Sequence, residues 1–357
     1  MTSITAPPAL TSRRLVAGDR ALPDTVTVRT GPPGRGELRV RAAYSLVSPG
    51  TELHYLDRWA GTGEGLPLGY CSAGVVDAVG PGAPGFAVGD RVTAMGWGEA
   101  VHGDVVTVPY RLCRRVADGV DLADAVVANL AATAVHAVDR AELRPGDETA
   151  VVGAGMVGLL VAQIAAVRDH RATVLDLRPE RVGAAASLGL SAATGRDFFD
   201  REEKGAELPE GGRCVFLCGT GEAGETLAAA ARWAGRAPGR PRLVGVGRFS
   251  ARVDFSVELG NLDIRYAARC GAGYRDPSYA RGLSDVSAPE GEGTVTENLQ
   301  RALDLIEDGA VQPARMGLPR VPLERAAEVY AELRERPAHP AVIFTYGSGE
   351  ANEGSRA

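Results

Sequence analysis

Three glycines in one short segment have the spacing of a phosphate-binding turn. They are Gly153, Gly155 and Gly158. The apolar run before them, residues 150–152, suits a buried parallel strand, and the run after them, residues 156–167, suits a helix. In such a unit the first glycine allows the tight turn, the second lets a pyrophosphate approach the backbone, and the third lets the helix pack on the sheet. The N–H groups that begin the helix then face the phosphates.

An acidic residue completes this unit. Asp176 lies 23 positions after Gly153 and ends the next apolar run, residues 172–175. A carboxylate there accepts hydrogen bonds from ribose hydroxyls and repels a 2′-phosphate. We therefore expect a dinucleotide cofactor, NAD rather than NADP, with Arg178 keeping NADP as the alternative. The expected cofactor contacts are Gly153, Gly155, Met156, Val157, Gly158, Asp176, Leu177, Arg178, Cys218, Gly219 and Gly245.

The composition is that of an ordinary globular chain with room for two domains. It has 357 residues, 45% hydrophobic and 24% charged, and a formal net charge of −6. No basic cluster exists beyond short arginine pairs, which argues against a nucleic-acid partner. We also expect no membrane span and a cytoplasmic location, because the chain has no 18-residue apolar run and its N-terminus lacks the apolar core of a signal peptide.

The five cysteines indicate reduced thiols and no structural zinc lobe, because their spacing is scattered and no clustered CxxC set occurs. They are Cys71, Cys113, Cys214, Cys218 and Cys270.

The first part of the chain, to about Asn129, reads as β-rich. Short valine-rich runs separated by Gly, Pro and Asp turns cover residues 37–42, 74–79, 91–94 and 104–108. A helical pattern follows over residues 122–141. After Asp176 strands and helices alternate, which indicates a doubly wound sheet. We expect a helix near 178–188, a strand at 213–217, a helix at 224–233 and a strand at 243–246.

The last part of the chain, from about Val311, is too short to form a domain and is expected to return to the first one. It contains a helical pattern at 323–334, a strand pattern at 341–346 and a polar tail from Gly347. The predicted protein is therefore α/β. Its domains are a β-rich one over residues 1–129 and 311–357, and a dinucleotide-binding one over residues 130–310.

This organisation resembles the medium-chain dehydrogenase/reductase superfamily. The local motifs that carry the resemblance are GYCSAGVV at residues 69–76, VGDRV at 88–92 and RPGD at 144–147. The resemblance implies a GroES-like catalytic domain, a Rossmann domain and an NAD(P)-dependent oxidoreductase. It also implies a homodimer or homotetramer that associates through the nucleotide-binding sheet, with residues 242–247 and 264–268 as candidate edge strands.

The zinc alcohol dehydrogenases of this superfamily bind a catalytic metal at three positions that match Pro49, Tyr70 and a position near Ala128 here. These residues do not supply the nitrogen, sulfur or oxygen donors of a catalytic zinc site. We therefore expect the zinc-lacking branch of the superfamily. The Ser48–Glu52 segment is similar to bacteriochlorophyllide dehydrogenase-like proteins. The Cys270–Tyr279 segment is similar to saccharide-pathway dehydrogenases, which often carry a second oxidoreductase domain that we do not expect here.

Without zinc, other groups must handle the proton. Thr51 and His54 match the proton-relay positions of the metal enzymes, and Tyr70 occupies a vacated ligand position, so these three form the candidate catalytic set. The alternatives are that Thr51 caps a turn, that His54 is a surface residue and that Tyr70 fills the space left by zinc. Of the other histidines, His136 is expected to pack inside and His170 to be exposed. The expected substrate contacts are Cys71, His102, Tyr274 and Arg275.

The function that these features favour is hydride transfer between a nicotinamide and a secondary alcohol/ketone pair. The substrate would be a polyol, a cyclitol or a biosynthetic intermediate. The first alternative is reduction of an activated C=C or C=N bond, which needs no alcohol proton relay. The second alternative is a catalytically silent protein that only binds the cofactor.

Overall fold

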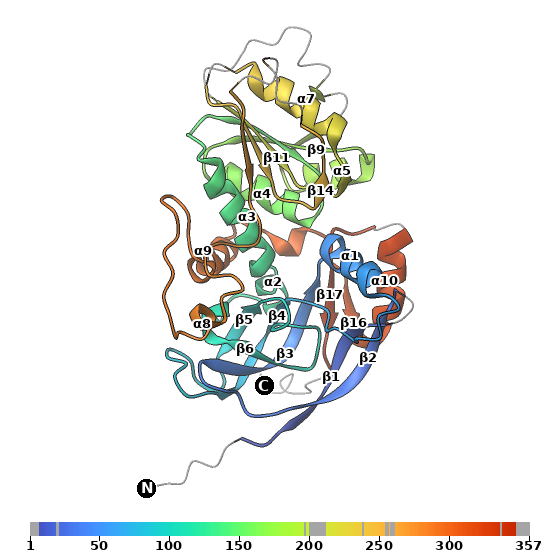
Figure 1. Ribbon diagram of the computed structural model, residues 1–357, viewed down its shortest axis with the longest axis vertical. Helices are drawn as coiled ribbons and strands as arrows, with labels where there is room; N and C mark the ends of the chain where they lie inside the picture. The colour runs from blue at the N-terminus through green and yellow to red at the C-terminus, as the bar shows by residue number, and fades with distance from the viewer. Residues whose placement is uncertain are drawn as a thin grey trace, which may run out of the picture.

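The computed structural model describes residues 7–18, 21–195, 198–199, 212–237, 239–253, 257, 261–335 and 338–347. Two lobes lie one above the other (Figure 1). The blue beginning and the red end of the chain lie together in the lower lobe. The green and yellow middle of the chain forms the upper lobe.

The upper lobe is built on a parallel sheet with the strand order β10-β9-β8-β11-β13-β15. The chain runs outward from β8 to β10, then returns to the other side of β8 and runs outward again. The order therefore reverses between β8 and β11, and ligands of doubly wound sheets bind at such a switch point. The strands are β8 (Glu148–Val152), β9 (Arg171–Asp176), β10 (Ser191–Thr194), β11 (Arg213–Leu217), β13 (Arg242–Gly245) and β15 (Asp263–Tyr266).

Helices cover both faces of this sheet, because neighbouring strand residues point to opposite sides. Val151 and Phe216 pack with α3 (Ala128–Ala141) and α4 (Met156–Val167). Their neighbours Ala150 and Val215 pack with α7 (Gly224–Gly235). The helix α5 (Pro179–Ser187) packs beside β9 and β10. The doubly wound architecture expected from the sequence is confirmed.

The lower lobe contains a mostly antiparallel sheet with the order β16-β17-β3-β4-β5-β7, in which β6 also pairs with β3. Val342 in β17 pairs with Val47 in β3, so the end of the chain completes the sheet begun near its start. An N-terminal hairpin, β1 (Leu10–Ala17) with β2 (Pro23–Thr30), lies against this lobe. The sheet strands are β3 (Glu37–Val47), β4 (Cys71–Val79), β5 (Arg91–Met95), β6 (Val105–Pro109), β7 (Cys113–Arg115), β16 (Arg320–Pro322) and β17 (Val342–Thr345).

Two helices at opposite ends of the sequence pack together beside this sheet. They are α1 (Pro49–Trp59), which has proline at its first position, and α10 (Ala326–Glu335). Leu56 of α1 and Tyr330 of α10 have no exposed surface and share one core. This packing fixes α1 at the side of the lower lobe that faces the upper lobe (Figure 1).

A third group of helices connects the lobes. The helix α9 (Val295–Glu307) packs along α3, and a capping box formed by Thr294 and Glu297 begins it. Two short helices, α2 (Leu122–Ala125) and α8 (Pro277–Ala280), precede α3 and α9. Among the helices of the described residues, none is long and apolar enough to cross a membrane.

The structure corrects three expectations from the sequence. The helical pattern at 122–141 forms two helices, because α2 ends at Ala125 and α3 begins at Ala128. The strand β13 lies inside the sheet, paired with β11 and β15, so residues 242–247 do not form an edge and β15 does. His170 is buried rather than exposed. Its backbone N–H donates to the Ala165 carbonyl at the end of α4, and its ring nitrogen Nδ1 lies 3.1 Å from the Arg144 carbonyl oxygen. The predicted polar tail beyond Gly347 lies outside the described residues.

Candidate functional site

The glycine turn after β8 has an open side at the switch point. Gly153 has a φ of +103°, which favours glycine, and a Cβ at Gly158 would lie 1.8 Å from the carbonyl oxygen of Gly153. A Cβ at Gly155, in contrast, would meet no atom within 4 Å. The first and third glycines are therefore required by the fold itself. The second faces open space, where a bound phosphate has room.

The helix α4 begins at this turn without a side-chain cap. Gly155 is its N-cap residue and makes no capping hydrogen bond. The first amides of α4, at Met156 and Val157, are among the backbone donors that a helix leaves unpaired at its start. A pyrophosphate beside Gly155 would be held by these N–H groups and by the positive end of the helix dipole.

The loop after β11 forms the other side of the switch point. A Cβ at Gly153 would lie 3.0 Å from the amide nitrogen of Gly219, so the two turns are neighbours. A Cβ at Gly219 would meet no atom within 4 Å. Cys218 is half-buried and its backbone N–H donates to Val152. The residues expected to hold a dinucleotide therefore gather at one end of the parallel sheet, and they fit that ligand.

Asp176 connects the glycine turn to the end of β9. Its carboxylate accepts the N–H of Ala154 at 2.9 Å and the N–H of Arg178 at 3.0 Å, and Arg181 lies 3.5 Å away. Arg178 itself pairs with Glu180. Leu177, between them in the sequence, is 71% exposed, and its contact with the cofactor stays a prediction. The arrangement leaves Asp176 beside the open turn, where it would meet a ribose.

Gly245 has a packing role in the fold. A Cβ there would lie 2.9 Å from the Tyr266 ring and 3.0 Å from the Phe249 ring. A side chain at this position would therefore displace the two rings that cover the end of β13. A contact with the cofactor remains a prediction for the Gly245 backbone.

The start of α1 lies against the upper lobe. A Cβ at Gly50 would lie 3.3 Å from the methyl group of Thr220, which follows Gly219 in the loop after β11. Thr51 comes next in α1, and its N–H donates to the Ser48 carbonyl. The fold thus brings the candidate hydroxyl of Thr51 close to the switch point of the Rossmann sheet.

Tyr70 lies beside this start of α1. Burial raises the pKa of its phenol well above the ordinary value, although hydrogen bonding to Ser48 and Thr51 acts in the opposite direction. The phenol therefore stays protonated, and it is a hydrogen-bond donor. Asn129 fixes this segment, since its amide donates to the Tyr70 carbonyl at 2.6 Å and to the Cys71 sulfur at 3.1 Å.

Cys71 is fully buried, and burial raises the pKa of its thiol well above the ordinary value. A protonated and buried thiol is a poor nucleophile. A substrate contact of Cys71 stays a prediction.

His54 lies on the same helix as Thr51 but is not joined to it. Among the described residues no hydrogen bond links the Thr51 and His54 side chains. The His54 ring instead lies edge-on to Tyr55, with ring centroids 5.4 Å apart. Burial and the charge of Arg248 lower the pKa of His54. The structure therefore brings Thr51 and Tyr70 together and leaves His54 at the periphery.

His102 belongs to a buried polar network beneath α1. Its Nε2 is 2.9 Å from Glu52 Oε2 and its Nδ1 is 2.6 Å from Ser45 Oγ. Tyr330 donates to the same Glu52 carboxylate, and Tyr346 is hydrogen-bonded to Ser45. His102 has no exposed surface, so its place in the structure is that of a support for α1 rather than a wall of the substrate site.

The sequence reasoning missed this network. Glu52 is the acid in the first turn of α1, and such an acid is ordinarily solvated. The tyrosines that complete the network come from the returning C-terminal segment. No local pattern in the sequence marks them as partners of Glu52.

The segment with Tyr274 and Arg275 follows β15. Burial raises the pKa of Tyr274 above its ordinary value, against a hydrogen bond with the Trp97 backbone that lowers it. Arg275 is exposed and has a φ of +63°, a left-handed conformation that costs a non-glycine residue about 1–3 kcal/mol. Such outliers persist where the surrounding structure enforces them.

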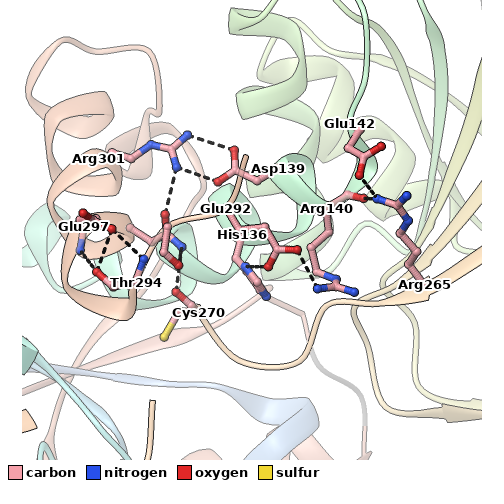
Figure 2. Close-up of polar contacts among 12 residues, drawn as sticks. His136, Asp139, Arg140, Glu142, Arg265, Cys270, Glu292, Thr294, Glu297 and Arg301 are labelled. Carbon is pink, nitrogen blue, oxygen red and sulfur yellow. Dashed lines mark hydrogen bonds and ion pairs between the residues drawn. The ribbon is translucent and has the colours of Figure 1, made fainter. Parts of the chain in front are cut away.

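Hydrogen bonds from α9 hold this segment in place. Asn298 donates to the carbonyls of Cys270, at 3.0 Å, and of Gly293, at 3.3 Å. Arg301 of α9 reaches Asp139 of α3 at 2.6 Å (Figure 2). The close-up also shows Glu292 between the side chains of His136 and Arg140. The segment is thus attached to the helices that join the two lobes.

The positions that match the zinc ligands lack a donor set. Pro49 is the first residue of α1, Ala128 is the buried first residue of α3, and Tyr70 is a protonated phenol. In the part of the chain that the structure describes, no three His, Cys, Asp or Glu side chains gather as a metal site. Zinc independence is taken up as a proposal below.

The chain is similar in sequence to proteins of two kinds. It is 35% identical over 197 residues to erythronolide synthase EryA2 of Saccharopolyspora erythraea, which is 52% of this chain and 5% of that protein. It is 26% identical over 210 residues to sorbitol dehydrogenase of Halalkalibacterium halodurans, which is 50% of this chain and 60% of that protein. The chain therefore spans less than two thirds of the length of these relatives. No protein-family model matches it.

Solved structures share the whole fold at low sequence identity. An oxidoreductase/dehydrogenase of unknown specificity from Escherichia coli superposes with a TM-score of 0.76 at 16% identity, covering 95% of this chain and 100% of that one. An alcohol dehydrogenase from Escherichia coli CFT073 in complex with NADH gives a TM-score of 0.72 at 17% identity, covering 94% and 99%.

The fold and its switch point define a two-domain protein with a GroES-like lobe and a Rossmann lobe. Together with the sequence matches, they make the chain similar to the medium-chain dehydrogenase/reductase superfamily. The resemblance stated from the sequence motifs is confirmed at this level.

Proposed function

We propose that this chain is a zinc-independent, NAD(P)-dependent oxidoreductase that acts on a secondary alcohol/ketone pair of a polyol, cyclitol or biosynthetic intermediate. The observation that carries the proposal is the close approach of Thr220 to Gly50, where a Cβ on Gly50 would lie 3.3 Å from the Thr220 methyl group. This approach supports a position for Thr51 and Tyr70 beside the open glycine turns of the Rossmann sheet. Among the relatives are dehydrogenases named for sorbitol and for galactonate, which supports an oxygenated carbon chain as substrate.

A dinucleotide fits the residues present, with Gly155 and Gly219 facing open space and Asp176 beside them. When bound, its nicotinamide supplies or accepts the hydride. The structure similar to this chain that contains NADH supports a nicotinamide cofactor. Asp176 favours NAD over NADP, because a 2′-phosphate would meet its carboxylate.

The proton would be handled by Tyr70 and Thr51. Hydride arriving at a carbonyl carbon leaves an alkoxide, which needs a donor within hydrogen-bond reach. The Tyr70 phenol is protonated and half-buried, and Thr51 lies close enough to influence the pKa of the phenol, so Tyr70 would donate to the oxygen and Thr51 would orient the phenol. In the reverse direction the same pair would accept the alcohol proton. His54 would contribute only through water, since it lacks a direct bond to Thr51.

A panel of polyols and cyclitols monitored at the NADH absorbance tests the proposal. We expect NAD-dependent turnover of at least one secondary alcohol, retained after dialysis against a chelator. Tight NADH binding with no turnover of any alcohol, ketone or activated alkene would contradict the proposal and favour a catalytically silent cofactor-binding protein.

A second candidate function is reduction of an activated C=C or C=N bond. The missing hydrogen bond between Thr51 and His54 favours it, because protonation of an enolate carbon needs no relay to solvent through His54. A quinone oxidoreductase is also among the solved structures with this fold. Normal turnover of an enone by the protein, with no turnover of any alcohol in the panel, would favour this second candidate.

A further inference from the structure

Four aromatic side chains form one wall next to the candidate catalytic residues. Trp97, in the turn after β5, lies 4.5 Å from Tyr55, 5.8 Å from Trp59 and 5.6 Å from Tyr70, measured between ring centroids. Tyr55 and Trp59 of α1 are also stacked on each other at 4.8 Å. All four rings are partly exposed. Such faces pack against an aromatic ring or the C–H face of a sugar-like carbon chain.

Two arginines from the segments after β13 and β15 meet this wall at Tyr55. The guanidinium carbon of Arg248 lies 5.3 Å from the centroid of the Tyr55 ring. Burial raises the pKa of Tyr55, but hydrogen bonding to Arg248 and Arg275 and the charges of both arginines outweigh it, and the net pKa is lowered. Arg248 and Arg275 are both exposed. The guanidinium of Arg248 therefore lies at the Tyr55 ring, and the charge of Arg275 acts on the same phenol.

Neither arginine has an acidic partner. In the described part of the chain Arg248 and Arg275 form no ion pair, whereas Arg281, nearby in sequence, pairs with Glu37 at 2.7 Å. Two acidic residues, one close in sequence to Tyr55 and one next to Arg275, have other partners. Asp57 of α1 pairs with Arg334, and Asp276 accepts the N–H groups of Ser278 and Tyr279 at the start of α8.

A third cation reinforces the positive charge. The guanidinium carbon of Arg269 lies 5.7 Å from the centroid of the Tyr274 ring, next to Arg275 in the same segment. Guanidinium groups bind carboxylates and phosphates through paired N–H donors. The region thus offers forked donors and positive charge, and among the described residues Arg248 and Arg275 are not engaged by a carboxylate.

We propose that Arg248 and Arg275 bind a carboxylate or phosphate group of the substrate while Tyr55, Trp59 and Trp97 pack against its carbon skeleton. This inference rests on the proposed function, since it places the reacting carbon toward Thr51 and Tyr70. The substrate class is then an anionic hydroxy or oxo compound, such as a sugar acid or a sugar phosphate. Neutral polyols lack the group that the two arginines bind.

Equilibrium binding tests this inference without turnover. Benzoate and phenyl phosphate carry the anion beside a ring, and benzamide and benzyl alcohol are their neutral counterparts. Trp59 and Trp97 report binding by fluorescence, and a Trp233→Phe background removes the third tryptophan, which lies buried against Arg213. We expect at least one of the two anions to bind about tenfold or more tightly than its neutral counterpart. The tighter anion then identifies the group as carboxylate or phosphate.

Substitution separates this site from general charge effects. Arg248→Gln and Arg275→Gln should each weaken binding of the preferred anion about ten- to a hundredfold and leave benzamide binding unchanged. Arg58→Gln is the matched control, because Arg58 is an exposed arginine on the same helix as Tyr55. It should change anion binding less than about twofold. The melting temperatures of all three variants verify that they are folded.

Three results would overturn the inference. The first is equal affinity for the anions and their neutral counterparts. The second is unchanged anion binding in both arginine variants. The third is competition between NADH and the anion, together with weakened NADH binding in Arg248→Gln. The last result would assign the arginines to the cofactor. Anion binding without any NAD-dependent turnover would instead contradict the proposed function alone. Turnover of neutral alcohols without anion binding would contradict this inference alone.

Discussion

Glu52 Oε2 lies 2.9 Å from His102 Nε2, and neither side chain has any exposed surface. The other carboxylate oxygen of Glu52 accepts the Ser48 N–H at 2.7 Å, directly before the helix that carries Thr51. The pair therefore connects the start of α1 to the interior of the GroES-like lobe. The position of the candidate catalytic hydroxyl depends on a contact that itself takes no part in chemistry.

Removing Glu52 should destabilise the fold and the site together. In Glu52→Ala, His102 and Tyr330 lose a buried hydrogen-bond partner, and each buried polar group left unsatisfied costs about 1–3 kcal/mol. Glu52→Gln keeps an acceptor and should cost less. Chemical unfolding measures the stability, and kcat reports the placement of Thr51. If Glu52→Ala unfolds at the wild-type denaturant concentration, the network does not support α1.

Gly155 and Gly158 should separate cofactor binding from folding. Gly155→Ala adds a methyl group into open space at a φ of −79°, so the melting temperature should stay unchanged. The same methyl group would oppose a pyrophosphate, and NADH affinity should fall about tenfold or more. Gly158→Ala would place its Cβ 1.8 Å from a carbonyl oxygen and should lower the melting temperature. Normal NADH affinity in Gly155→Ala would move the pyrophosphate site elsewhere.

Asp176 should set the preference between the two nicotinamide cofactors. Asp176→Ser removes the charge that opposes a 2′-phosphate and keeps an acceptor for the Ala154 N–H. The ratio of the Kd values for NADPH and NADH should fall about ten- to a hundredfold, which matches one charge-assisted hydrogen bond. Calorimetric titration measures both constants. Tighter binding of NADPH than NADH by the unchanged protein would contradict the assignment.

Tyr70 and Thr51 should carry the proton step. Tyr70→Phe and Thr51→Val should lower kcat about 10²- to 10³-fold, the usual effect of losing one oxyanion donor, with little change in NADH affinity. Because the pKa of Tyr70 is raised, its proton is retained through pH 10, and no alkaline loss of activity below that pH should come from it. If both variants keep normal turnover, the acid–base group lies elsewhere.

His54 should make a smaller contribution with a defined pH signature. Its pKa is lowered, so the ring is neutral above its ordinary pKa of 6.5 and becomes charged only in more acidic solution. His54→Ala should reduce kcat less than the Tyr70 and Thr51 variants do, and should remove any activity change on the acidic side of pH 6.5. An unchanged pH profile would exclude His54 from the relay.

The strand β15, which is outermost on one side of the Rossmann sheet among the described residues, should join two copies of the chain. Ile264 is 42% exposed and Tyr266 is 54% exposed on this edge, and an uncovered edge favours pairing. Light scattering should give a dimer or tetramer, and Ile264→Lys should shift the protein toward the monomer. A monomer at micromolar concentration in the unchanged protein would count against this arrangement.

The sequence predicted the parts of the fold that depend on local spacing. The strand at 213–217 and the helix at 156–167 have the predicted bounds, because apolar periodicity and glycine punctuation specify both. The helix α9 was missed although Thr294 and Glu297 form a capping box, a pattern visible in the sequence. Local signals thus located most of the Rossmann lobe.

The site itself depends on contacts that no local pattern shows. Glu52 meets Tyr330 across 278 positions of sequence, and the acid was not recognised as buried. Arg248 approaches Tyr55 only because the two lobes face each other. The sequence singled out Arg275 and Tyr70 through their resemblance to family motifs. Their neighbours became visible only once the chain was folded.

The measurement that tests the central claim most directly combines metal content with turnover. Tag-free protein is dialysed against a chelator, its zinc is determined by elemental analysis, and NADH formation is followed across a panel of sugar acids, sugar phosphates and polyols. Our account predicts substoichiometric zinc and undiminished NAD-dependent turnover that falls about 10²- to 10³-fold in Tyr70→Phe. Stoichiometric zinc whose removal abolishes turnover would contradict it.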